Sequence, residues 1–321
     1  MQIKVTGELS GLCVRDVLRR HLSLSTKMLK YLKYRNDGIS VNGEKCTVRY
    51  VLRDGDVLEI MLEDRASSEA VDPVELPLEI LYEDADLVVP SKPAQMPTHP
   101  SHDHYRDTVA NALAFRYAKE GIPFVFRPIN RLDRNTSGLL LVARNKHSAG
   151  RLSGQLQRGE IQKTYLAVLD GAMEKEHGVI DACLHRTKES IIVREVCSPD
   201  APDADEARTE YDVLCRGERH TLVAARPITG RTHQLRVHFA SLGHPITGDD
   251  LYGTPSPLID RHALHAAALS FRHPVSNEKM LVRAPLPDDL LRLMETCFPT
   301  IYQEVLDEFF RIAAPSAPAC R

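Results

Sequence analysis

A polar, acidic segment with two prolines divides this chain into two unequal parts. Residues 63–77 read EDRASSEAVDPVELP, and Pro73 and Pro77 cannot donate the backbone hydrogen bonds of a helix interior or a central strand. A chain of 321 residues is long enough for a small module before this segment and a larger domain after it. The sequence therefore predicts a module over residues 1–62, a linker over 63–77, a main domain over 78–312 and a tail over 313–321.

Charge is segregated along the chain. The net charge is −3, yet residues 1–60 hold eleven Lys and Arg against seven Asp and Glu, and residues 127–170 hold eight against three. A negative net charge therefore does not exclude a nucleic-acid partner, because local islands of positive charge are what phosphates contact.

Composition and motif spacing narrow the class of protein. The chain is 43% hydrophobic and 26% charged, as soluble globular proteins are, and no apolar stretch approaches the roughly 20 residues of a membrane span. The opening MQIKVTGELSG lacks a secretory pattern, and the seven cysteines are scattered without a Cys-x-x-Cys pair, so we expect a reduced, cytoplasmic protein. His99, His102 and His104 lie in a polar stretch without metal-ligand spacing, so we expect no metal site.

Two short helices and several short strands are predicted in the first 62 residues. Residues 14–22 have apolar side chains at helical spacing, and a second helix is expected to begin with Ser25 as its N-cap. Residues 38–43 alternate apolar and polar positions before an Asn-Gly turn, and residues 51–60 predict a hairpin around Asp54-Gly55. The second helix has an apolar face opposite a basic face, which is formed by Lys27, Lys30 and Lys33.

This order of helix, helix, strand and hairpin, over about residues 10–62, resembles the S-four-like RNA-binding module. The resemblance implies that Lys27, Lys30 and Lys33 contact RNA. The alternative is a small α+β domain whose lysines only solvate a surface helix, and the charge pattern alone supports either. The Val-Asn-Gly turn after the basic helix favours RNA binding.

The main domain is predicted to be α+β with a mixed sheet, because short β-branched stretches alternate with a few helices and no βαβ regularity or repeat is present. Thr232 is a plausible N-cap and Gly243 a plausible C′ residue, which predicts a helix over residues 233–242 with Arg236 in its first turn. That helix is expected to bury Leu235, Phe239 and Leu242. Residues 288–312 predict one or two amphipathic helices.

The segment RPINRLDRNTSGLLLVAR, residues 127–144, combines a polar turn with an apolar strand expected over 139–142. Asp133 is the one acid of this turn, and an acid at the mouth of a strand is as typical of an ordinary turn as of a catalytic site. Its neighbours Arg131 and Arg134 favour the ionised carboxylate at neutral pH, even where burial would oppose it.

Three motifs in order resemble those of RluA-like RNA pseudouridine synthases, over roughly residues 78–286. The loop RLDRNTSG is similar to the family's signature loop, although Asn130 stands where the family most often has His. KTYLAVLDG, which begins at Lys163, is similar to the family's Lys-x-Tyr-x-Ala strand, and GRTHQLRVH, which begins at Gly230, is similar to its third motif. Lys92-Pro93 is similar to the family's Asn-Lys-Pro-Ala-Gly loop, with other residues on either side.

The resemblance implies the roles of individual residues. Asp133 would act at the ribose as a base or a nucleophile, Tyr165 would stack on the uracil and assist proton transfer, and Arg236 would pair with Asp133. Arg131 would fill the space left by the flipped uridine. Contacts to RNA would come from a further set of polar residues, Lys92, Lys163, Arg231 and Gln234.

The predicted reaction converts uridine in structured RNA to pseudouridine without a cofactor, and no phosphate-cradling or dinucleotide motif is present. Large-subunit ribosomal RNA is the more usual target of family members with such an N-terminal module, and tRNA is the alternative. A sugar hydrolase would need a pair of carboxylates, which the Asp133 motif lacks. A non-catalytic RNA-binding protein would not need Asp133, Tyr165 and Arg236 together. We expect a monomer.

Overall fold

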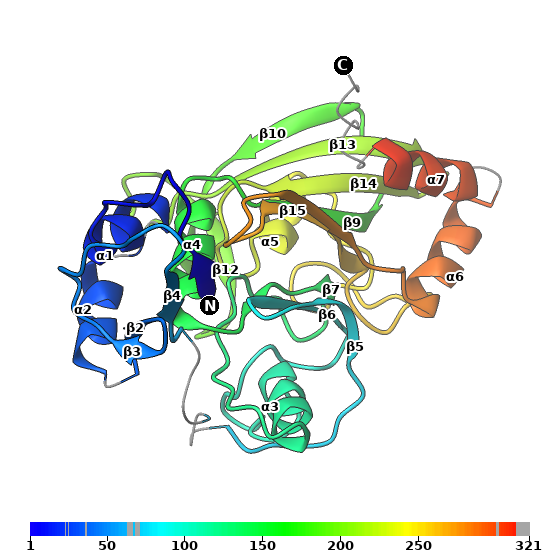
Figure 1. Ribbon diagram of the computed structural model, residues 1–321. Helices are drawn as coiled ribbons and strands as arrows, with labels where there is room; N and C mark the ends of the chain where they lie inside the picture. The colour runs from blue at the N-terminus through cyan, green and yellow to red at the C-terminus, as the bar shows by residue number, and fades with distance from the viewer. Residues whose placement is uncertain are drawn as a thin grey trace.

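The structure is a computed structural model, and it describes residues 1–22, 24, 26–35, 37–62, 67, 71–299 and 302–312. Figure 1 shows a small N-terminal unit beside a larger unit built on one long sheet. The predicted N-cap Ser25, most of residues 63–70 and the predicted tail over 313–321 lie outside the described residues.

The N-terminal module, residues 1–62, has its own sheet and its own hydrophobic core. Its buried side chains include Val14, Leu18, Leu32 and Leu58, none of which is exposed. Its elements are β1 (Gln2–Lys4), α1 (Val14–Asp16), a π-helical turn η1 (Val17–His21), α2 (Thr26–Tyr34), β2 (Ile39–Val41), β3 (Glu44–Lys45) and β4 (Val57–Ile60). The antiparallel sheet has the order β1-β4-β2-β3, so the two predicted helices and the strand before the Asn-Gly turn are confirmed.

The hairpin predicted over residues 51–60 is wrong. Strand β4 pairs with β1 and β2, while Val51 forms an isolated bridge with Cys13 and the amide of Leu52 donates to the carbonyl of Leu12 at 3.0 Å. The Asp54-Gly55 turn exists, with Gly55 at a φ of 87°, but it leads from the segment that contacts Cys13 and Leu12 into β4.

The main domain contains a ten-stranded mixed sheet, which confirms the predicted fold class. Its strands are β5 (Glu79–Glu83), β6 (Leu87–Lys92), β7 (Ser137–Leu139), β8 (Val142–Ala143), β9 (Gln162–Asp170), β10 (His177–Asp181), β13 (Arg208–Arg216), β14 (His220–Pro227), β15 (Leu264–Arg272) and β16 (Lys279–Arg283). The order is β10-β13-β14-β9-β15-β7-β6-β5, with β16 also paired to β15 and β8 to β6. Pairing is antiparallel except between β15 and β7. Strand β15 thus joins the two halves of the sheet.

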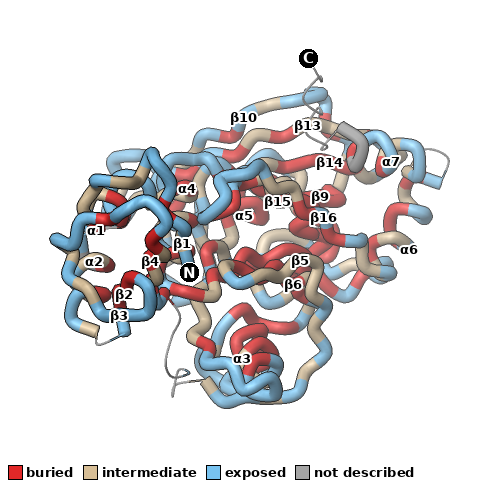
Figure 2. Tube along the Cα trace, viewed as in Figure 1, coloured by how far each residue is buried: buried red, intermediate tan, exposed pale blue. Residues whose placement is uncertain are grey.

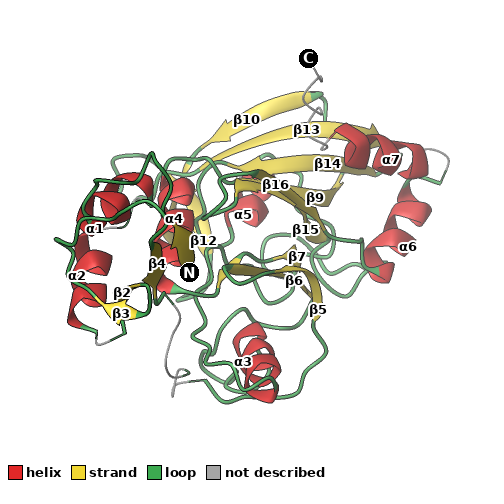
Figure 3. Cartoon of the chain, in the orientation of Figure 1, coloured by secondary structure: helices red, strands yellow, loops and turns green. Residues whose placement is uncertain are grey.

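Helices cover this sheet and extend from its edges (Figure 3). They are α3 (Val109–Lys119), α4 (Lys146–Gln157), α5 (Gln234–Ser241), α6 (Asp288–Cys297) and α7 (Tyr302–Ile312), so residues 288–312 form two helices, within the prediction. A two-stranded ribbon, β11 (Cys183–Arg186) and β12 (Arg194–Cys197), lies apart from the main sheet. Among the described residues, no helix combines the length and apolar composition that crossing a membrane requires.

Helix α5 differs in detail from its prediction. It begins after His233, which is the N-cap in a left-handed conformation with a φ of 58°, so Thr232 is not the cap. Leu235 and Phe239 are buried as expected, whereas Leu242 is 43% exposed because it lies past the last helical turn. Gly243 has the positive φ expected of a C′ residue.

The buried core follows the central strands of the sheet, as Figure 2 shows in red. Part of the predicted linker packs against α3, since the Asn111 side chain donates to the carbonyl of Asp72 at 2.8 Å and the Val74 amide donates to the carbonyl of Asn111 at 3.2 Å. The C-terminal part of the predicted linker, which includes Asp72 and Val74, therefore packs on the main domain.

Candidate active site

The loop that carries Asp133 is fixed at nearly every residue. The Thr98 hydroxyl donates to the carbonyl of Leu132 at 2.9 Å, and Thr136 and Ser137 contact the imidazoles of His262 and His265 at 2.8 and 2.9 Å. The loop then enters the sheet through Gly138, where a Cβ would lie 2.3 Å from the carbonyl oxygen of Ala266 on β15. Only glycine permits this approach, so the backbone on both sides of Asp133 is held against the centre of the sheet.

Lys92 is one of the residues that fix this loop, and it is not available to RNA. Its side chain is 1% exposed, and its ammonium donates to the carbonyls of Pro93, Met96 and Arg134 at 2.8–2.9 Å. Burial lowers the pKa of Lys92 to about 7, although the nearby Asp133 carboxylate opposes the fall. The expectation that Lys92 contacts RNA is corrected, because all three of its protons are donated inside the protein.

Tyr165 and Lys163 lie on the same face of β9, two residues apart, and line one pocket with Asp133. Ala225 of β14 and Ala266 of β15 are the register partners of Tyr165, so its ring has small neighbours on both sides. Burial raises the pKa of Tyr165, and the Asp133 carboxylate adds to the rise. Tyr165 therefore keeps its proton at neutral pH. Burial also lowers the pKa of Lys163, whose ammonium lies 3.5 Å from the carbonyl of Thr229.

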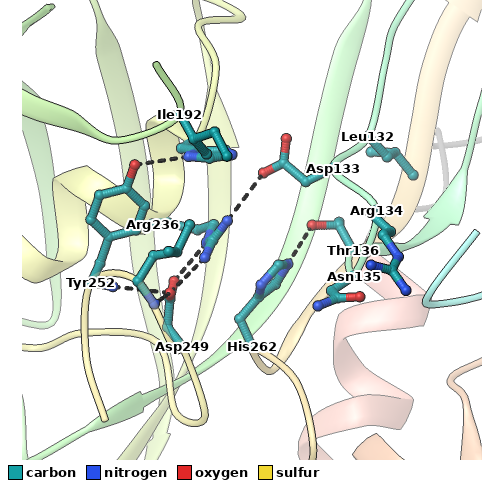
Figure 4. A network of polar contacts seen from close by, with 12 residues as sticks. Leu132, Asp133, Arg134, Asn135, Thr136, Ile192, Arg236, Asp249, Tyr252 and His262 are labelled. Carbon is teal, nitrogen blue, oxygen red and sulfur yellow. Dashed lines mark hydrogen bonds and ion pairs between the residues drawn. The ribbon is translucent and has the colours of Figure 1, made fainter. Parts of the chain in front are cut away.

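Arg236, in the first turn of α5, lies between two carboxylates (Figure 4). Its Nε and Nη2 donate to the Oδ2 and Oδ1 of Asp249, each at 2.6 Å, and its Nη1 lies 4.0 Å from the Oδ2 of Asp133. The tight partner of Arg236 is thus Asp249, and Asp133 faces the remaining nitrogen of the guanidinium. The Tyr252 ring lies 5.0 Å from the guanidinium carbon and limits its movement further.

Asp249 is a site residue that the sequence motifs did not identify. It is fully buried and also accepts from the backbone amides of Leu251 and Tyr252 at 3.0 and 3.1 Å. Burial would raise the pKa of Asp249, but the Arg236 guanidinium outweighs burial and lowers it. Its signal in the sequence is an acid followed by a turn, GDDLYG, which many surface loops share.

The charges around Asp133 differ from those predicted. Arg134 donates through Nε to the carbonyl of Gln95 at 3.3 Å, and Arg131 is exposed at the rim of the pocket. In the described part of the chain, the cation in ion-pair range of Asp133 is Arg236. The expectation that Arg131 and Arg134 hold this carboxylate ionised is therefore corrected.

Asn130, which stands where the similar family most often has His, bridges a break between two strands. Its Nδ2 donates to the carbonyl of Leu139 at 3.2 Å, and its Oδ1 accepts from the amide of Leu141 at 2.8 Å. Strand β7 ends at Leu139 and β8 begins at Val142, so the single strand predicted over 139–142 is two short ones.

Gln234 and Arg231 hold the loop between β14 and α5. The carbonyl oxygen of the Gln234 side chain accepts from the Thr229 hydroxyl and the Arg231 amide, and its nitrogen donates to Arg208 and Thr209. With its amide occupied in this way, Gln234 positions the loop, which corrects the expectation of a direct RNA contact. Arg231 donates to the carbonyl of Glu206 and pairs with Asp205 at 3.1 Å, but its side chain stays 43% exposed.

The pocket formed by these loops has a volume of about 550 Å³ and opens between the Asp133 loop and the β14–α5 loop. Its lining includes Asp133, Tyr165, Arg236, Lys163 and Arg131. Among the described residues of this lining, Asp133 is the sole carboxylate. The arrangement offers one carboxylate with a fixed guanidinium and a protonated phenol, and it lacks the second acid that sugar hydrolysis by a carboxylate pair requires.

A separate group of possible metal ligands, Asp84, Asp86 and His273, lies outside this pocket. Its atoms are used in the fold, since Asp84 pairs with His273 at 2.8 Å and Asp86 accepts from Asn145 and Ser148. Of the histidines singled out in the sequence, His104 contacts Asp107 at 2.6 Å and His99 lines the active-site pocket.

The predicted basic face of α2 is exposed at Lys30 and Lys33, while the side chain of Lys27 lies outside the described residues. The same helix touches the main domain, because the ammonium of Lys146 lies 4.1 Å from the centre of the Tyr31 ring. Neither Lys30 nor Lys33 lines the active-site pocket.

Comparisons with known proteins show the family to which the chain belongs. The family model described as RNA pseudouridylate synthase matches residues 86–241, which include Asp133, Tyr165 and Arg236. A Bacillus subtilis protein named uncharacterized RNA pseudouridine synthase YjbO is 38% identical over 274 residues, which cover 85% of this chain and 95% of that protein. The ribosomal large subunit pseudouridine synthase D of Nitrosomonas europaea is 31% identical over 315 residues, covering 92% and 87%.

A solved structure, human RNA pseudouridylate synthase domain containing 1, is similar with a TM-score of 0.58 and 29% identity, over 75% of this chain and 97% of that one. With a mixed sheet of the expected class and relatives that match most of its length, the chain belongs to the RluA-like family of RNA pseudouridine synthases and is an isomerase of RNA.

Proposed function

We propose that Asp133 is the catalytic carboxylate with which this enzyme turns uridine into pseudouridine. The observation that carries this proposal is the pocket in which Asp133 is the sole described carboxylate and faces Nη1 of Arg236 at 4.0 Å. Detaching uracil from C1′ of the ribose, rotating it and rejoining it through C5 needs a group at the sugar and no redox partner. One carboxylate on a fixed backbone supplies that group, as base or as nucleophile.

Arg236 and Tyr165 complete the site in this proposal. Two nitrogens of Arg236 are occupied by Asp249, so the third has a fixed direction toward Asp133 and limits how that carboxylate can turn. Tyr165 remains protonated, so its ring stacks on the uracil and its hydroxyl donates a hydrogen bond during the proton transfer at C5. Arg131, exposed at the rim, fills the space in the RNA stack when the uridine turns into the pocket.

Asp133→Asn tests the central role. The amide is nearly the same size, so the fold and the RNA affinity should stay close to wild type while pseudouridine formation is abolished. The measurement is single-turnover conversion of RNA, with binding titrations and urea unfolding on the same variant. Arg134→Gln is the matched control, because Arg134 is exposed on the same loop and donates to a backbone carbonyl away from Asp133. Turnover of the Asn variant within a few-fold of wild type would refute the assignment.

We propose large-subunit ribosomal RNA as the target and the N-terminal module as the part that selects it. The relative from Nitrosomonas europaea, named for the ribosomal large subunit, matches across 92% of this chain, which includes most of the module. Mapping pseudouridines in RNA from cells with and without the gene tests the target. Sites lost from tRNA with ribosomal RNA unchanged would favour the alternative substrate.

The module is proposed to bind RNA through α2 without taking part in the chemistry. Replacing Lys27, Lys30 and Lys33 by Gln removes up to three phosphate contacts, and each contact contributes roughly 0.7–0.9 to the salt slope of binding. Affinity should fall and the salt dependence flatten, while the rate at saturating RNA stays the same because Asp133 lies in the other domain. Unchanged affinity would show that these lysines only solvate the helix.

A further inference from the structure

A groove larger than the active-site pocket lies between the N-terminal module and helix α4. Its volume is about 800 Å³, and its walls are Met28 and Tyr31 of α2 on one side and the face of α4 with Arg151 on the other. The two walls are joined where the ammonium of Lys146 lies over the Tyr31 ring.

Positive charge dominates this groove in a chain whose net charge is −3. One carboxylate, Glu160, lines it together with four cations, which are Lys146, Arg151, Arg158 and Arg272. Glu160 is paired with Arg158 at 2.7 Å, and Arg272 donates to the carbonyl of Asn277 at 2.9 Å. The side chain of Arg151, which is half-buried, makes no hydrogen bond or ion pair with the described residues, so its guanidinium is available to an anion.

The face of α4 that lines the groove carries two glycines, and packing within the fold does not explain Gly150. Gly150 and Gly154 lie one turn apart on α4, and both line the groove. A Cβ at Gly150 would meet nothing within 4 Å, so no packing constraint explains glycine inside a helix, where it is less stable than alanine. The absence of a side chain instead lets a ligand backbone approach the helix closely beside Arg151.

The groove lies next to the active site. The last turn of α4 borders both cavities, since Leu156 lines the active-site pocket while Gln155 and Arg158 line the groove. A strand of RNA with its uridine in the pocket has one negative charge per nucleotide on either side. It can follow the end of α4 from one cavity into the other.

We propose that this groove binds the phosphodiester backbone of the substrate RNA beside the target uridine, with Arg151 as a phosphate contact. The inference rests on the proposed function and deepens it, because it gives the RNA a path between the active site and the module. Binding there would hold the module and the main domain on one RNA segment, so the groove contributes affinity and not chemistry.

Three variants test the groove. Arg151→Gln removes the available cation, Gly150→Glu places a carboxylate in the groove, and Gly150→Gln adds the same bulk without charge. Both Gly150 variants should fold, because their Cβ has open space and both residues form helices better than glycine. Lys119→Gln is the charge control, an exposed cation at the end of α3 that lines neither cavity. The probe is unmodified large-subunit ribosomal RNA made by transcription.

Arg151→Gln should raise Kd several-fold at low salt and reduce the salt slope by about 0.7–0.9, the share of one phosphate. Gly150→Glu should weaken binding more than Gly150→Gln, and the loss should appear in Kd and not in the single-turnover rate at saturating RNA. Kd and salt slope equal to the Lys119→Gln control would overturn the inference while the wild type still forms pseudouridine. A wild type that neither binds nor modifies RNA would overturn the proposed function, and the inference with it.

Discussion

Removing the Asp249 carboxylate should damage this protein more than removing any exposed charge. The Asp249 side chain is fully buried and that of Arg236 is 5% exposed, so Asp249→Ala leaves a guanidinium in the interior without its bidentate partner. Loss of one partner from a buried pair costs about 3–5 kcal/mol. The amides of Leu251 and Tyr252 also lose their acceptor, which places the expected loss at the upper end of that range. For a domain of this size, Tm should fall by roughly 10–20 °C.

The assay is urea unfolding followed by circular dichroism, on Asp249→Ala, Arg236→Met and the double variant Arg236→Met/Asp249→Leu. The double variant should recover much of the lost stability, because no charge is left unpaired, yet it should remain inactive since nothing faces Asp133. A loss below about 1 kcal/mol for Asp249→Ala, or a double variant as unstable as the sum of the two single ones, would refute the reasoning.

The pH dependence of the same variant gives a second measure. The pKa of Asp249 is lowered in the folded state, so its contribution to stability is present above the unfolded value near 3.9 and is lost as pH falls through the folded pKa. The difference in unfolding free energy between wild type and Asp249→Ala should therefore be constant near neutral pH and narrow in acid. A difference that grows as pH falls would contradict the pairing.

Three further predictions follow from the site and from two glycines. Arg236→Lys should fold better than Arg236→Ala but convert RNA slowly, because an ammonium cannot pair with Asp249 and face Asp133 together, and full activity would exclude this role. Burial lowers the pKa of His262 to about 3, so wild-type stability should fall as pH drops below about 6.5, and His262→Gln should flatten that fall in urea midpoints at pH 7 and 5. Gly138→Ala should cost about 3 kcal/mol or more, whereas Gly150→Ala should gain about 0.5–1 kcal/mol, and equal unfolding midpoints would contradict the contrast.

Local patterns in the sequence predicted local structure well. The helices near residues 14–22 and 26–34, the Asn-Gly turn and the mixed-sheet class follow from periodicity and turn chemistry. The hairpin predicted over residues 51–60 was wrong because strand pairing is not a local property. The turn is present, but β4 pairs with β1 and β2, which lie further away in the sequence. Partner choice depends on packing of the whole module, which no short window contains.

The sequence motifs predicted that Asp133, Tyr165 and Arg236 belong to one site, and all three line one pocket. The motifs did not identify the residues that hold these side chains in place. Asp249 lies 13 residues after Arg236 and pairs with it more tightly than Asp133 does. Lys92 was expected on the surface, as most lysines are, and its burial depends on three carbonyls that come together only in the folded loops. A pattern of residue types identifies chemical groups, whereas their depth and partners arise from the tertiary structure.

The position of β15 makes completion of the sheet depend on a late part of the chain. Strands β5 to β8 form one half-sheet from earlier parts of the chain, and strands β9, β10, β13 and β14 form the other. Residues 264–270 pair with β9, while residues 265–266 pair with β7. Until this strand inserts, no strand pairing joins β7, which follows the Asp133 loop, to β9, which carries Tyr165. Because a chain folds from its N-terminus as it leaves the ribosome, the module and the half-sheets can form first. In the proposed function, the nascent protein would therefore bind RNA through the module before its catalytic pocket is complete, and catalysis would begin only near the end of translation.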